Sequence, residues 1–240
     1  MTLSRVLLVL TLVVSACAPA ALSAPTESPT LRPTLPANVE TTGAPETPRP
    51  SVSVAPPPAG CANGFAVQSG SIVVRITERV GPIAVHEAVI ESDALSGAFV
   101  VSGARRFDSC SAIVADLRKL RSTDSVPGED VRQRDEHIHE EFLETATFPY
   151  AVLALAGIDG VPDPLPASGT WQATVVGDMT LHGKTRPVSW KVSATRDGES
   201  LTATATAEIQ FADFNIFRPN QVLSLGEAIR VEVKVATRSR

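Results

Sequence analysis

The sequence has few of the features that mark a nucleic-acid-binding protein or a helical membrane protein. It contains no basic stripe and no interleaving of basic with aromatic residues, and only 5% of its 240 residues are aromatic. The formal net charge is −5 at pH 7, and removal of a leader that carries Arg5 makes it −6. This balance argues against nucleic acid as a partner. The apolar stretch Val6–Val14 is far shorter than the roughly 20 residues that cross a bilayer.

The sequence also has no nucleophile and base at a spacing that indicates catalysis. The serines lie in predicted turns or on polar strand faces, and the acidic residues of 140–144 are typical of a solvated helix face. His137 and His139 would point about 200° apart on a helix, away from a shared metal ion. His86 is interpreted as a loop residue. We therefore predict a protein that is not an enzyme, without catalytic residues, metal or cofactor.

The N-terminus is typical of a bacterial lipoprotein leader. A short basic region, Met1–Arg5, precedes the apolar stretch, and small residues then precede Cys17. This pattern predicts a signal peptide over residues 1–16, lipidation of Cys17, and an exported protein anchored to a membrane of the cell envelope. The alternative is an ordinary signal peptide that is cut slightly later, near Ala18-Pro-Ala or Ala24, with Cys17 discarded.

A Pro/Thr/Ser-rich segment, 17–60, follows the leader and contains almost no large apolar residues. Such a composition cannot bury a core, so a disordered linker is predicted, extended where proline is dense. O-linked sugars and an unmodified tether both fit it. The remaining residues, 61–240, are numerous enough for one domain with a sizeable core.

Two of the three cysteines remain once Cys17 is assigned to a lipid. Cys61 and Cys110 form an even pair in an oxidising compartment, which predicts a disulfide that contributes about 4 kcal/mol to stability. Two free thiols are the alternative.

Period-two alternation recurs through the domain and predicts half-buried antiparallel strands. Gly-containing turns separate the segments, and seven or eight such strands favour closure into an all-β barrel. The segments are 71–77, 97–102, 111–120, 170–181, 188–194, 202–211 and 230–235.

One helix is predicted, from about Asp130 to Glu144. The inward face of segment 203–211 is mostly alanine, which leaves room for a slender ligand inside the barrel. The facing Trp171 and Trp190 could equally fill that space.

Two ordered motifs resemble the YceI-like family. The first, Arg134-Asp-Glu-His137 with the following Phe-Leu and Phe-Pro, is similar to a stretch of that family. The second, Gly177-Asp-Met-Thr-Leu-His-Gly-Lys-Thr-Arg-Pro-Val188, is similar to its hairpin, and an Asp-Phe pair follows later. Phe211 stands where the family usually has arginine. The motif residues are interpreted as structural: Arg134, Asp135, His137, His182, Gly183 and Asp213. We expect His137 and His182 to hydrogen-bond with Asp135 or Arg134 and so to hold the helix on the hairpin.

The resemblance implies a lipocalin-like barrel of about eight strands with one covering helix, which binds polyisoprenoid or other long amphiphilic chains. We therefore predict an envelope-anchored carrier for an isoprenoid or fatty-acyl-like ligand. Because buried CH₂ groups would provide the binding energy, we expect the carrier to select ligands by length and shape. A filled barrel that binds a protein partner is the alternative, and a metal-assisted envelope enzyme is a weaker one. The predicted ligand-binding residues are Leu117, Trp171, Trp190, Val192, Ala203, Ala205 and Phe211, with Phe142 and Phe148 near the mouth.

Overall fold

The computed structural model describes residues 60–80, 84–125, 130–216 and 223–240. The predicted signal peptide, the lipidation at Cys17 and the linker up to residue 59 lie outside the described residues. Within the described part of the chain, no helix is both long and apolar enough to cross a membrane.

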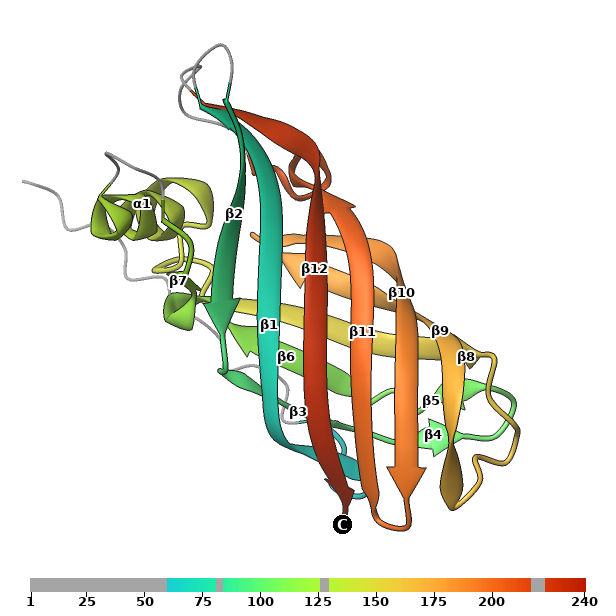
Figure 1. Cartoon of the computed structure of the whole chain (residues 1–240). Helices are drawn as coiled ribbons and strands as arrows, with labels where there is room; N and C mark the ends of the chain where they lie inside the picture. Colours follow the sequence, from blue (N-terminus) through green and yellow to red (C-terminus); the bar gives the residue numbers. More distant parts are fainter. Residues whose placement is uncertain (1–59, 81–83, 126–129, 217–222) are drawn as a thin grey trace, which may run out of the picture. The chain divides into compact units, whose positions relative to one another are not determined.

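The described chain consists mainly of β-strands, with three short helical segments and one α-helix (Figure 1). The first half contains β1 (Phe65–Val80), β2 (Ala84–Ser92), β3 (Leu95–Phe99), β4 (Val101–Ser102), β5 (Arg106–Phe107), β6 (Ala112–Asp116), η1 (Leu117–Lys119) and β7 (Arg121–Ser122). The second half contains α1 (Val131–His137), η2 (Ile138–Phe142), β8 (Tyr150–Asp159), β9 (Ser168–Leu181), β10 (Lys184–Asp197), β11 (Ser200–Gln210), η3 (Phe211–Phe214) and β12 (Leu223–Ser239).

The sheet closes on itself as an antiparallel barrel. Its hydrogen-bonded order runs β12-β11-β10-β9-β8-β6-β3-β1, and β1 also pairs with β12 over nearly its whole length. Beyond its contact with β3, β1 pairs with β2, which in turn pairs with β7. The eight strands of the closed circuit confirm the predicted fold class.

The helical segment lies beside β7 at the end of the barrel opposite the C-terminus (Figure 1). Helix α1 begins after Asp130, whose side chain accepts a hydrogen bond from the backbone N–H of Arg132 and so caps the helix. It continues into the π-helical turn η2, so the predicted helix is present but irregular in its second half. We refer to α1 and η2 together as the lid, residues 131–142.

Alternation places the apolar face of each long strand inside the barrel. Along β9, Ala173, Val175, Met179 and Leu181 are buried, and the residues between them are mostly exposed. The same alternation runs through β10 and β11. The barrel interior is therefore apolar, and its outer face carries the Ser, Thr and charged residues.

The turn between β9 and β10 explains one sequence motif. His182 and Gly183 have φ of 49° and 70°, which is the backbone of a two-residue type I′ hairpin turn. A Cβ on residue 183 would lie 2.9 Å from Phe148 Cε1, so glycine is required there for space as well as for conformation.

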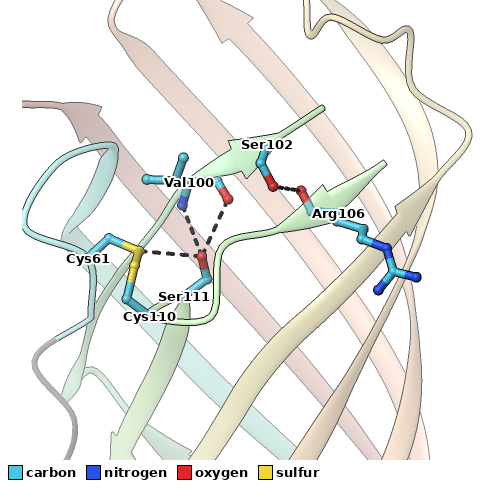
Figure 2. The surroundings of a disulfide bond; sticks show 6 residues. All are labelled: Cys61, Val100, Ser102, Arg106, Cys110 and Ser111. Atoms are coloured by element: carbon cyan, nitrogen blue, oxygen red, sulfur yellow. Dashed lines mark hydrogen bonds between the residues drawn. A yellow bond between two sulfur atoms is a disulfide. The ribbon is translucent and has the colours of Figure 1, made fainter. Parts of the chain in front are cut away.

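The predicted disulfide joins Cys61 to Cys110 and attaches the start of the domain to the segment before β6. Figure 2 shows Ser111 beside it, with its Oγ 3.1 Å from the backbone nitrogen of Val100 and 3.5 Å from Cys61 Sγ. Ser111 is 1% exposed, so its hydroxyl satisfies polar groups that water does not reach.

Candidate functional site

The half of the barrel far from the lid contains an apolar cavity of about 150 Å³, which we call the distal cavity. Every residue of its lining is apolar, and all but Val161 and Leu165 come from strands. Its walls include Phe99, Leu153, Leu155, Trp171, Val175, Trp190, Val192, Ala203, Ala205 and Val233.

A second cavity of about 150 Å³ lies beneath the lid, and we call it the lid cavity. Ile138 and Phe142 of η2 line it from the lid side, and Phe211 and Ile216 line it from the segment after β11. Arg134 and His137 are its only polar lining residues. Strand residues that line it include Ile76, Ile90, Leu181, Ile209 and Ile229.

The two cavities lie end to end along the barrel. Ile72, Ala151, Met179 and Val231 line both, and we call these four residues the waist. On β9 the lining runs from Trp171 in the distal cavity to Leu181 in the lid cavity. That stretch measures about 33 Å along a strand. With a strand tilt of about 35–45°, it corresponds to about 25 Å along the barrel axis.

The structure places eight of the nine predicted ligand-binding residues on these linings. Those on the distal cavity are Trp171, Trp190, Val192, Ala203 and Ala205. Those on the lid cavity are Leu117, Phe142 and Phe211. Phe148 lines neither cavity and instead packs against His182, with 4.6 Å between ring centroids. The two tryptophans form part of the distal wall and leave the cavity open.

Strand β8, which follows Pro149, contributes to the lining but was not among the strands predicted from the sequence. Leu153, Leu155 and Ile158 of this strand line the distal cavity. They alternate with Ala154 and Ala156, which are exposed, so the strand alternates in side-chain size and has few polar residues. A test for large–small alternation would have found it. Strand β2 was also missed.

A buried charged cluster attaches α1 to the segment after β7. Arg134 is 8% exposed and donates to both carboxylate oxygens of Asp124, at 2.9 and 2.8 Å. It also donates to Ser122 Oγ, while Asp135 accepts from the Ser122 backbone N–H at 2.9 Å. His86, on β2 and not in a loop as predicted, contacts Asp124 as well.

This cluster changes the ionisation of Asp124. Burial disfavours the charged carboxylate, but hydrogen bonds from Arg134, the backbone of Val89 and His86 together outweigh burial and lower the pKa of Asp124 to about 2. The carboxylate is therefore ionised at any physiological pH. It holds Arg134 in the wall of the lid cavity.

The segment that follows the lid, which contains Glu144, is attached through the β9–β10 turn. His182 lies 2.7 Å from a carboxylate oxygen of Glu144 and 3.3 Å from the backbone oxygen of Phe214. His182 therefore links the segment after the lid, the hairpin and η3. Phe214 itself is 1% exposed.

These contacts correct the predicted roles of the motif residues. We had expected His137 and His182 to bond Asp135 or Arg134. Instead, His182 pairs with Glu144, Arg134 and Asp135 bind the 122–124 segment, and His137 is half exposed and lies 4.0 Å from Glu141. Asp213 is exposed in η3. Gly183 forms the turn.

The histidines do not converge on a metal site among the described residues. His139 Nε2 lies 3.0 Å from the backbone oxygen of Leu120 and 2.9 Å from an Arg121 nitrogen. Within residues 60–80, 84–125, 130–216 and 223–240, no three His, Cys, Asp or Glu side chains lie in a group suited to a metal ion.

A closed antiparallel barrel with an apolar interior and a helical lid defines a lipocalin-like protein. The chain belongs to the YceI-like domain family, which matches residues 75–237. A UPF0312 protein of Pseudomonas putida (strain W619) is 32% identical over 94 residues, covering 36% of this chain and 45% of that protein. The chain thus spans somewhat less than half the length of that curated relative.

Solved structures share the fold at low sequence identity. A polyisoprenoid binding domain from Saccharophagus degradans, implicated in plant cell wall breakdown, has a TM-score of 0.54 and 14% identity. The match covers 74% of this chain and 99% of that domain. BcnA of Burkholderia cenocepacia has a TM-score of 0.46 and 15% identity, over 69% of this chain and 95% of that one. The first of these supports the barrel assignment.

Proposed function

We propose that this protein binds a long apolar or amphiphilic chain, of isoprenoid or fatty-acyl type, inside the barrel, and that it does so without catalysis. The observation that carries the proposal is the pair of apolar cavities stacked along the barrel through the waist. Two apolar cavities in line, with a lining about 25 Å long, suit an extended hydrocarbon better than a compact polar metabolite.

The apolar lining provides enough free energy for such a ligand. Each buried CH₂ contributes about 0.8 kcal/mol, so about ten buried carbons contribute about 8 kcal/mol before the costs of association. Only the surplus over those costs appears as binding free energy, so chains with more buried carbons bind more tightly. The distal lining has no charged or hydroxyl group, so the length and width of the ligand contribute to specificity there.

The relatives support the ligand class. The similar solved domain from Saccharophagus degradans is described as polyisoprenoid binding, and the chain shares its barrel and belongs to the YceI-like family. Phe211 lines the lid cavity and gives its wall an apolar side chain at that position.

The proposal includes a place of action. Export through the N-terminal leader, lipidation of Cys17 and a proline-rich tether would hold the barrel near a membrane of the cell envelope. A tether of that composition extends about 3 Å per residue where proline is dense, so the barrel could reach lipids at a distance from its own anchor.

Native mass spectrometry of the protein, purified without detergent, tests the proposal. We expect a discrete adduct that is released on denaturation and proves to be rich in hydrocarbon. A clean apo mass that persists after incubation with isoprenoid lipids would contradict the proposal and favour a barrel that recognises a protein partner.

A further inference from the structure

Trp190 carries a hydrogen-bond donor that the described protein does not satisfy. The residue is 3% exposed, and its indole Nε1 has no hydrogen-bond partner. It is the only buried side-chain nitrogen or oxygen in this condition within the part of the chain that the structure describes. Buried tryptophans usually pair this N–H with an acceptor, so an unpaired indole nitrogen is unusual.

The surroundings of Trp190 cannot provide that acceptor. Trp190 lines the distal cavity, whose other lining side chains are all hydrocarbon or aromatic, apart from the thioether of Met179 and the second indole of Trp171. A buried water needs two to four polar partners, which such a lining does not supply. Phenylalanine or leucine would line the same wall without an unpaired donor, so an acceptor brought by a bound molecule would give the indole nitrogen a role.

We propose that the Trp190 N–H donates a hydrogen bond to a carbonyl or hydroxyl oxygen of the bound lipid. This inference rests on the proposed function and deepens it, because it requires an oxygenated amphiphile and excludes a plain hydrocarbon as the preferred ligand. It also orients the ligand. The oxygen lies in the distal cavity, beside Val175 on β9, and away from Arg134 and His137 in the lid cavity.

Trp171 provides a matched control. It lines the same cavity and is the only other tryptophan of the chain, but it is half-buried and its nitrogen is not among the buried unpaired atoms. Substitution of either residue by phenylalanine removes a similar amount of apolar wall. Only Trp190→Phe also removes the unpaired donor.

The test compares two probes, farnesylacetone, which is an isoprenoid ketone, and the hydrocarbon that lacks its carbonyl oxygen. We expect Trp190→Phe to lower the affinity for the ketone by a factor about ten times larger than its effect on the affinity for the hydrocarbon. A difference of that size is typical of one buried hydrogen bond. Trp171→Phe should change both affinities by the same factor. Calorimetric titration of the folded variants measures all of these values.

A second measurement observes the N–H directly. The Trp171→Phe protein retains Trp190 as its single tryptophan, so its spectrum contains one indole N–H resonance. The ketone should move this resonance downfield, as hydrogen bonding does, and the hydrocarbon should not.

The outcomes separate this inference from the function on which it rests. If the wild type binds neither probe, the carrier proposal fails and the inference fails with it. If the wild type binds both probes, but Trp190→Phe weakens them equally and the indole resonance responds to both alike, only the role of the Trp190 N–H is overturned.

Discussion

The two cavities of this barrel have the same volume but differently built walls. Strands joined by continuous backbone hydrogen bonds form nearly all of the distal cavity. The lid cavity is closed by α1, η2 and η3. Side-chain contacts at Asp124 and at His182 attach this region to the rest of the barrel. Opening the distal wall would therefore break pairs of strands together, whereas the lid is held by a few separate side-chain contacts.

The largest expected effect concerns the distal end. Replacing both Cys61 and Cys110 by serine releases a loop with a sequence separation of 49. On the chain-entropy account, the free energy of unfolding falls by about 4 kcal/mol. Denaturant unfolding of the wild type and the double variant measures this difference. Equal midpoints would show that the distal end does not depend on its disulfide.

The next effect concerns the lid. Asp124→Asn leaves the guanidinium of Arg134 buried without its carboxylate, and we expect a loss of about 3 kcal/mol in the free energy of unfolding. Glu199→Gln is the control, because Glu199 and Arg238 are both more than two-thirds exposed and such pairs contribute about 0–1 kcal/mol. Similar losses in the two variants would contradict a stabilising role for the buried Asp124–Arg134 pair.

The stability of the protein should depend on pH through the ionisation of Asp124 in the same cluster. The pKa of Asp124 is lowered to about 2 in the folded protein from 3.8, so its stabilisation is present above pH 4 and is lost as the pH falls toward 2. The corresponding contribution is about 2 kcal/mol. The stability difference between the wild type and Asp124→Asn should therefore shrink over that interval. A constant difference would assign the stabilisation to another group.

The smallest effect concerns the second attachment of the lid. Glu144 is half exposed, so Glu144→Gln should cost no more than about 1 kcal/mol of stability. Because the β9–β10 turn remains intact, we expect faster hydrogen exchange of the amides in 138–145 with little change in the barrel strands. Unchanged exchange in this segment would show that His182 does not restrain the lid.

The sequence predicted the barrel and part of its lining because alternation directly reports which side chains face inward. Val192, Ala203 and Ala205 were found in this way. Strand β8 escaped because both of its faces are mainly apolar, so that only side-chain size alternates. A prediction by alternation therefore requires a polar outer face.

The lid contacts could not be predicted from spacing. Arg134 bonds Asp124, and His182 bonds Glu144, which is 38 positions away in the chain. The motifs include Arg134, Asp135 and His182, but only three-dimensional packing shows the partners of these residues. The unpaired nitrogen of Trp190 is likewise a property of its surroundings, which no local pattern reports.

The most direct test of the central claim is lipid binding by Ala205→Trp. Ala205 lies opposite Val192 and Val233 on the distal wall, so an indole at this position would occupy the distal cavity. Ala154→Trp, on the exposed face of β8, is the matched control. If both variants remain folded, we predict that Ala205→Trp loses extracted-lipid binding by about 100-fold, the equivalent of about 2.7 kcal/mol, and that Ala154→Trp binds as the wild type does. Unchanged binding by Ala205→Trp would contradict a ligand inside the barrel.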